Sequence, residues 1–224
     1  MATNSTPSRS VVESLVRDAL LREIGKPQPS VTTPVLEVNS SARHMHISPE
    51  NLEVLFGKGA ELTVHKWLYQ EGQFASQQTV TLVGPRKRII PNLRILGPCR
   101  NLTQIELAIT DAIQLGIDAP VRMSGDIDGT PGGYVMGPKG MLEMTNGIIR
   151  AARHVHMSPS DAKLYEVKHL DRITLKVTSP ACTTRFDDLI VRVDPSFKLE
   201  VHIDTDEANA CDLERATSVE LFKQ

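Results

Sequence analysis

The chain has 224 residues, enough for two small domains or one larger one. Its 25 Lys and Arg residues nearly balance 27 Asp and Glu residues, which argues against a strongly basic nucleic-acid-binding protein. Apolar runs fall far below the ~20 residues that cross a bilayer, so no membrane partner is expected. Three widely spaced cysteines, Cys99, Cys182 and Cys211, predict neither a zinc ribbon nor a disulfide framework.

Residues 1–34 predict a separate N-terminal segment. A capping box and apolar residues on one face predict an amphipathic helix over 10–24. Gly25 and Pro27 end this helix, and the Pro- and Thr-rich residues 25–34 predict a linker. Such a helix can either offer its apolar face to a partner or fold back on the core, and the pattern leaves both open.

Most of the remaining chain predicts short strands, with apolar and polar residues in frequent alternation. The predicted strands are 35–39, 42–47, 61–65, 78–83, 92–96, 103–109, 172–177, 189–193 and 198–203. Short helices are predicted at 49–56, 159–167 and 205–213. The glycine-rich stretch 129–140 predicts turns. Many short strands at this spacing are typical of small barrels or sandwiches.

An internal repeat is the clearest sign of how the chain is organised. SARHMHISPE at 41–50 matches AARHVHMSPS at 151–160, with Ala, Arg, both His, Ser and Pro identical. The repeat predicts two similar halves, 35–115 and 148–224, joined by a Gly- and Pro-rich connecting region at 116–147. Strands can be exchanged between such halves.

Each copy of the repeat carries a pair of histidines two residues apart, His44/His46 and His154/His156. On a strand both side chains of such a pair face the same side, with Cα atoms ~6–7 Å apart, so they can bind one metal ion. A single pair is more often solvated or structural, but its duplication favours a metal centre. A further candidate nitrogen and a candidate carboxylate are at His202 and Glu106.

Arginines near these motifs suggest further roles. Arg100 follows a Gly-Pro turn six residues before Glu106, where a guanidinium beside a metal could bind phosphate; a surface loop arginine is an equally open interpretation. Arg43 and Arg153 directly precede the histidine pairs and are interpreted as ion-paired structural residues, with contact to substrate as the alternative.

Other cations lie close together in the sequence. Arg86, Lys87, Arg88 and Arg94, together with Lys66, predict a local basic patch on a nearly neutral chain. Such a patch would suit a polyanionic molecule such as a nucleotide or coenzyme A, and a solvated hairpin face is the alternative.

Taken together, the motifs RHMHISP, LGPCRNLTQIE, APVRMSGDIDGTPGG, GPKG, ARHVHMSP and EVHIDTDEANA resemble the PduL-type phosphate propanoyltransferase family. The resemblance covers nearly all of residues 35–212. Its members are zinc-dependent phosphotransacylases associated with bacterial microcompartments. The resemblance implies a mainly β fold with short helices, in which two small β-barrel domains are related by internal pseudo-symmetry and an N-terminal amphipathic helix precedes them. It also implies exchange of a propanoyl group between coenzyme A and inorganic phosphate.

The same resemblance implies roles for particular residues. One zinc ion would be bound by His44, His46 and Glu106, and a second by His154, His156 and His202. Phosphate would be bound by Arg100. Coenzyme A would be contacted by Ser41, Lys66, Arg94, Leu96 and Asn209.

Localisation and partners also follow from the resemblance. Residues 10–24 match the family's encapsulation helix, which implies binding to the shell or core enzymes of a microcompartment in the cytoplasm. A homo-oligomer is expected.

Direct attack of phosphate on a zinc-polarised thioester, with no acyl-enzyme, is the expected mechanism. The residue patterns alone leave two alternatives open. One is a metal-dependent hydrolase of a phosphorylated or thioester substrate, and the other is a non-catalytic binding module with structural zinc.

Overall fold

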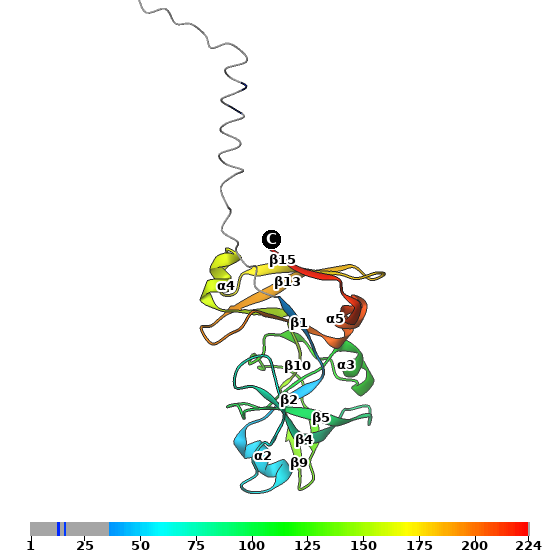
Figure 1. The fold of residues 1–224 in the computed structure, drawn as a ribbon. Coiled ribbons are helices and arrows are strands. Elements are labelled where there is room, and N and C mark those ends of the chain that lie inside the picture. The colour runs from blue at the N-terminus through cyan, green and yellow to red at the C-terminus, as the bar shows by residue number, and fades with distance from the viewer. Residues whose placement is uncertain (1–12, 14–15, 17–35, 224) are drawn as a thin grey trace, which may run out of the picture. The chain divides into compact units, whose positions relative to one another are not determined.

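The computed structural model describes Glu13, Val16 and residues 36–223. Apart from Glu13 and Val16, the predicted helix over 10–24 lies outside the described residues. From Leu36 onward the chain is mainly β, with two curled sheets and short helices, as predicted (Figure 1). In the described part of the chain, no helix has the length and apolar character needed to cross a membrane.

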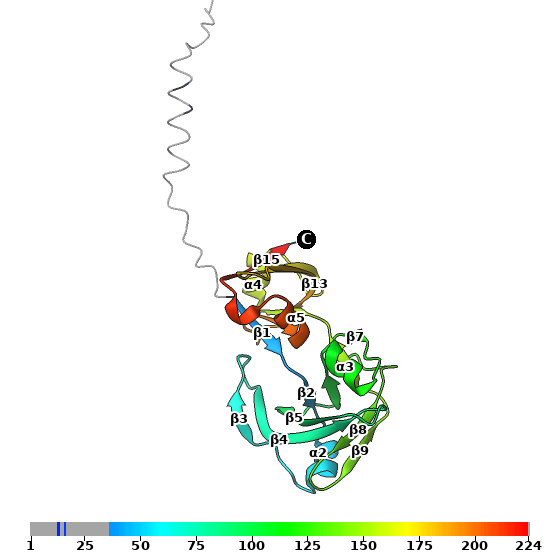
Figure 2. The ribbon, with the colours of Figure 1, turned by 90° about the vertical axis from the view of Figure 1, so that its right-hand side faces the viewer.

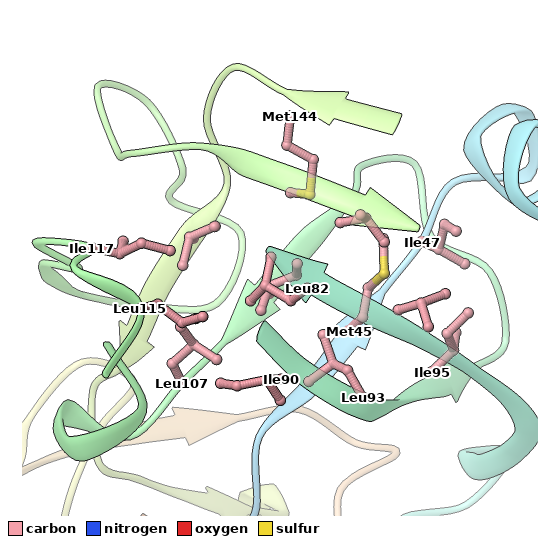
Figure 3. Close-up of a cluster of buried hydrophobic side chains, with 14 of the residues drawn as sticks. Met45, Ile47, Leu82, Ile90, Leu93, Ile95, Leu107, Leu115, Ile117 and Met144 are labelled. Atoms are coloured by element: carbon pink, nitrogen blue, oxygen red, sulfur yellow. The ribbon is translucent and has the colours of Figure 1, made fainter. Parts of the chain in front are cut away.

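The first sheet has the strand order β7-β10-β6-β2-β5-β4-β8-β9, and β3 pairs with β4. Its strands are β2 (His44–His46), β3 (Val64–Trp67), β4 (Phe74–Val83), β5 (Ile89–Gly97), β6 (Gln104–Glu106), β7 (Val121–Arg122), β8 (Gly133–Met136), β9 (Met141–Met144) and β10 (Ile148–Ala151). Helices α2 (Pro49–Phe56) and α3 (Ile109–Leu115) belong to the same half. Figure 3 shows its core, in which Met45 of the histidine strand packs among Leu82, Leu93 and Ile95.

The second sheet has the strand order β1-β14-β11-β13-β12-β15. Its strands are β1 (Glu37–Ser41), β11 (His154–Met157), β12 (Arg172–Thr178), β13 (Thr184–Val193), β14 (Glu200–Asp204) and β15 (Ser218–Lys223). The helices of this half are α4 (Pro159–Leu164), α5 (Thr205–Ala210) and the 3₁₀ helix η1 (Leu213–Arg215). A second cluster of buried apolar residues, separate from the first, packs against this sheet.

The two sheets share a common arrangement of strands. The order β10-β6-β2-β5-β4 in the first corresponds to β1-β14-β11-β13-β12 in the second. Each histidine strand is antiparallel to one neighbour, β6 or β14, and parallel to the other, β5 or β13. The predicted internal symmetry is therefore present in the strand pairing.

One strand of each half is exchanged. β1 directly precedes β2 in the chain but pairs with β14, whereas β10 directly precedes β11 but pairs with β6. Figures 1 and 2 show β1 in the opposite lobe from β2. The chain thus crosses between the sheets just before each histidine pair, which brings the two histidine strands to the junction of the lobes.

The Ser-Pro starts predicted for two helices are present. Ser48 accepts a hydrogen bond from the backbone N–H of Asn51 at the start of α2, and Ser158 forms a capping box with Asp161 at the start of α4. α4 ends at Leu164, before the predicted end at residue 167. These caps place each helix directly after a histidine strand.

The glycine-rich stretch 129–140 is not only turns. It contributes β8 and leads into β9, so region 116–147 adds strands to the first sheet rather than only connecting the halves. Gly137 lets the hairpin turn approach α2 closely, because a Cβ there would lie 2.4 Å from the carbonyl oxygen of Leu55. The strand predicted at 103–109 ends at Glu106 and is followed by a helix, α3, that the pattern does not predict.

Candidate metal and substrate site

The first histidine pair lies on β2, with a carboxylate opposite it on β6. His44 is in antiparallel register with Glu106, and all three side chains of this first cluster (His44, His46 and Glu106) are buried. The two rings have centroids 4.9 Å apart, as expected for neighbours on one face of a strand. His44 Nε2 lies 3.4 Å from Glu106 Oε2, and His46 Nε2 lies 3.8 Å from Glu106 Oε1. The three candidate ligands therefore converge.

The second cluster (His154, His156 and His202) has the same arrangement on β11 and β14. His154 is in antiparallel register with His202, just as His44 is with Glu106. Each pair of rings in the second cluster has centroids 4.9 Å apart. His202 is thus the structural counterpart of Glu106.

Backbone carbonyls orient one histidine in each cluster. His44 Nδ1 lies 2.8 Å from the carbonyl oxygen of Ala42, and His154 Nδ1 lies 2.9 Å from that of Ala152. Because a carbonyl oxygen only accepts, Nδ1 carries the proton in both rings and donates it. Nε2 then keeps its lone pair, which is the arrangement seen in metal-binding histidines.

Three of the cluster histidines, His46, His154 and His156, are held in the neutral form. Burial, reinforced by neighbouring histidines, lowers the pKa of His46 to about 3 and that of His156 to about 2. Burial and His202 lower the pKa of His154 to about 4. Burial alone would raise the pKa of Glu106, but the histidines of the first cluster outweigh it and hold this pKa well below its usual range. Neutral imidazoles and an ionised carboxylate are the forms that bind metals.

Both clusters fit a divalent metal ion such as zinc. Within each, the candidate ligand atoms lie within 4.8 Å of one another. Both ring nitrogens of the buried His156 lack a hydrogen-bond partner among the described residues. A buried polar group without a partner is costly, and a metal bond would satisfy it. Three protein ligands leave a coordination position open for water or substrate.

A single cavity of 620 Å³ is lined by both clusters. Arg100 also lines it, together with Ser41, Arg94 and Leu96 of the residues expected to contact coenzyme A. Ser41 Oγ lies 3.2 Å from His202 Nδ1. The predicted metal and phosphate residues, which are distant in sequence, therefore meet in one place.

Two predicted coenzyme A residues lie elsewhere. Lys66 is exposed on β3 and does not line the cavity. Asn209, on α5, lines a smaller pocket of 440 Å³, whose wall also includes Arg94. Arg94 donates to the carbonyl oxygen of Ser76 at 2.8 Å and lines both the cavity and this smaller pocket.

The predicted basic patch is not one cluster. Lys66 is in register with Ala75 near the start of β4, whereas Arg86, Lys87 and Arg88 form the turn after its end. About nine residues at ~3.3 Å per residue separate the two places. Sequence proximity suggested a patch, but the extended hairpin spreads its charges apart.

The arginines that precede the histidine pairs are ion-paired, as predicted. Arg43 lies 2.8 Å from Asp111 on α3, and Arg153 lies 2.9 Å from Glu207 on α5. These two pairs occupy equivalent places in the two halves, and each joins a histidine strand to the helix that follows the cluster's third ligand.

Glu200 places a buried carboxylate beside the second cluster, a role that the sequence pattern does not predict. Glu200 is 2% exposed, and its Oε2 lies 3.1 Å from His202 Nε2. Gln70 Nε2 donates to the same carboxylate at 2.5 Å, and Asn39 Nδ2 donates to its other oxygen. Gln70 and Asn39 come from distant segments, so Glu200 ties three parts of the chain to this cluster.

Three residues of the site were missed in the sequence prediction: Gln104, Glu200 and Arg192. Only the first two carry a signal in the sequence. Gln104 donates to Glu106 Oε1 at 2.7 Å and, like Glu200, lies two residues before a candidate ligand on the same strand. The spacing rule applied to the histidine pairs would have found both. Arg192 lines the cavity from β13, and no local motif marks it.

The comparisons with known proteins agree with these motifs. The family model described as phosphate propanoyltransferase matches residues 37–214. The chain is 52% identical to a phosphate propanoyltransferase of Planctopirus limnophila, over 96% of this chain and 92% of the relative. It is 51% identical to one of Thermotoga maritima, over 79% and 84%, and 40% identical to one of Listeria monocytogenes, over 96% and 95%. The chain therefore belongs to the phosphate propanoyltransferase family.

Proposed function

We propose that this enzyme exchanges a propanoyl group between coenzyme A and inorganic phosphate, with one zinc ion in each cluster. The observation that carries the proposal is the meeting of both clusters and Arg100 at one cavity. Membership of the family supports the phosphate acyltransferase activity. The donor chemistry of the clusters supports zinc.

Zinc bound in the clusters would supply positive charge for a thioester carbonyl and for a departing thiolate. The protein's contribution is to hold the ligands in place. The carbonyls of Ala42 and Ala152 orient His44 and His154, and Gln104 orients Glu106 by donating to its carboxylate. These contacts fix the ligands before substrate binds.

Arg100 binds and orients phosphate. Its backbone N–H donates to the carbonyl oxygen of Ile47 at 2.9 Å, which anchors the loop at the end of the histidine strand. Its side chain donates to Ser124 Oγ at 3.4 Å, and no described carboxylate lies within ion-pair distance. The guanidinium is therefore available to take two phosphate oxygens and offset their charge.

The reaction needs no strong base, because phosphate is already an anionic nucleophile. One phosphate oxygen attacks the thioester carbonyl carbon, a C–O bond forms, the C–S bond breaks and coenzyme A leaves as the thiolate. No cysteine of the described chain lines the cavity, which supports direct transfer over a cysteine-linked acyl-enzyme. Holding both reactants in one cavity removes much of the entropic cost of their encounter.

An exchange assay tests this proposal. The enzyme is given propanoyl-coenzyme A with or without phosphate, and free thiol and propanoyl phosphate are both measured. We expect thiol release that depends on phosphate, yields one acyl phosphate per thiol, stops with a chelator and returns with zinc. Thiol release without phosphate would indicate a hydrolase instead. Ping-pong kinetics or an acyl group trapped on the protein would contradict direct transfer.

We also propose that residues 10–24 direct the enzyme to a bacterial microcompartment, and that the enzyme is a homo-oligomer. The apolar stripe of 10–24 and the linker at 25–34 support the first part. Deleting residues 1–26 should leave exchange activity intact and abolish packaging with the shell, followed by co-purification. A truncated protein that no longer folds would show that this segment belongs to the core instead. Light scattering of the full chain tests the oligomer.

A further inference from the structure

A second arginine lines the cavity from the other sheet. Arg192 lies on β13, in register with His156 of the second cluster. Arg100 reaches the same cavity from the loop that follows β5 in the first sheet. Two other arginines line this cavity, but Arg43 is ion-paired with Asp111 and Arg94 donates to the carbonyl oxygen of Ser76. Each half of the molecule thus contributes one guanidinium that is not tied up in this way.

Arg192 is partly buried and makes no ion pair with a described residue. Its guanidinium lies 5.8 Å from the ring centroid of Phe197, and this ring stacks on His156 with centroids 4.2 Å apart. Arg185, on the same strand, is exposed and has Asp187 at 3.1 Å. Arg192 therefore lies over an aromatic ring, and no described carboxylate is within ion-pair distance of its guanidinium.

The two acidic side chains that line the cavity are engaged elsewhere. Glu106 is held by the histidines of the first cluster and by Gln104. Glu200 is held by Gln70, Asn39 and His202. Burial lowers the pKa of Arg100, Glu106 offsets part of this effect, and the charge of Arg192 lowers the pKa further, so the two cations act on each other. Glu106 acts on both arginines and Asp194 on Arg192, but no described carboxylate is in ion-pair contact with either guanidinium. Two partly desolvated cations in this state favour a bound anion.

We propose that Arg192 is a second phosphate-binding arginine, which holds the phosphate substrate together with Arg100. The inference rests on the proposed function for the identity of the anion. A guanidinium binds two oxygens along one edge of the phosphate tetrahedron. When the two guanidiniums bind two edges that share one oxygen, they contact three oxygens in all. The fourth oxygen then stays free to attack the thioester.

Phosphate binding to the metal-loaded full chain tests the role of Arg192 without requiring turnover. Calorimetry with inorganic phosphate is done on the wild type, Arg192→Gln, Arg192→Lys and the matched control Arg185→Gln. We expect Arg192→Gln to raise the Kd for phosphate about 10- to 100-fold, as for loss of a charge-assisted pair. Arg192→Lys should recover part of this loss because it keeps the charge, and Arg185→Gln should bind as the wild type does.

Kinetics and metal content complete the test. Arg192→Gln should raise the KM for phosphate while that for propanoyl-coenzyme A stays within about twofold. Wild-type phosphate affinity in Arg192→Gln would overturn the inference, and so would a loss of affinity that follows loss of metal. If the wild type binds phosphate but does not exchange acyl groups, the proposed function fails, while the calorimetric comparison still decides the role of Arg192.

Discussion

The buried histidines make the stability of the metal-free protein depend on pH. In the folded chain the pKa of His46 is lowered to about 3, that of His154 to about 4 and that of His156 to about 2. In the unfolded chain each returns to about 6.5. The unfolded state therefore binds more protons between these values, and the free energy of unfolding must fall as the pH falls.

The size of this effect follows from the same values. Lowering the pH from about 7.5 to about 5.5 costs ~1.4 kcal/mol for each histidine that stays neutral when folded. The three histidines together predict a loss of about 4 kcal/mol, a large part of the 5–15 kcal/mol that is typical of domains. Glu106 loses its ionised form only at lower pH, because its pKa is lowered too.

Urea unfolding of chelator-treated protein, followed by circular dichroism across this pH range, measures the loss. His156→Asn should reduce the loss by about a third, because one of three such groups is removed. His65→Asn, at an exposed position on β3, is the matched control and should keep the full pH dependence. A loss below about 1 kcal/mol in the wild type would refute the reasoning, since the histidines would then titrate alike in both states.

Three further predictions concern the second cluster, a helix cap and the core. His154→Ala should lower the metal content by one equivalent per chain and abolish exchange; full activity with unchanged metal by elemental analysis would refute its role as a ligand. Asp206→Ala removes two hydrogen bonds to Thr110 at the start of α3 and should lower the free energy of unfolding by about 1 kcal/mol; an unchanged urea midpoint would contradict this cap. Ile105→Ala, at a fully buried position in the first core, should lower the free energy of unfolding by about 2–5 kcal/mol in the same assay. A loss under about 1 kcal/mol would contradict this, because neighbouring core side chains would then have filled the cavity.

The local geometry of the site could be predicted because it depends on strand periodicity. Two residues that flank one position on a strand share a face, so His44 and His46 had to converge if the segment was extended. The same holds for His154 and His156. The duplicated motif also indicated the internal symmetry, which the strand order of the two sheets shows.

Features that depend on distant partners could not be predicted in this way. α3 begins at Ile109 with no cap from its own N-cap residue, and the carboxylate that bonds Thr110 comes from Asp206, 96 residues away. The exchange of β1 and β10 between sheets is likewise a matter of long-range pairing. Arg192 reaches the cavity only because β13 pairs with β11, so nothing in its neighbours along the chain marks it.

Glycine content misled the prediction at the hairpin of β8 and β9. Glycines normally indicate turns, and the density of Gly and Pro in 129–140 hid the short strand β8, which pairs with β9 directly after this stretch. In the structure some of these glycines serve close packing instead. Gly132 approaches the carbonyl oxygen of Met144 so closely that any side chain would clash.

Titration of metal-free enzyme with zinc, with exchange activity followed at each step, tests the central claim most directly. Two ions per chain should bind, one to each cluster. Phosphate-dependent formation of propanoyl phosphate should reach its full rate only when both clusters are loaded. Full exchange activity in the metal-free protein, or saturation of binding with no exchange at any metal content, would contradict the account.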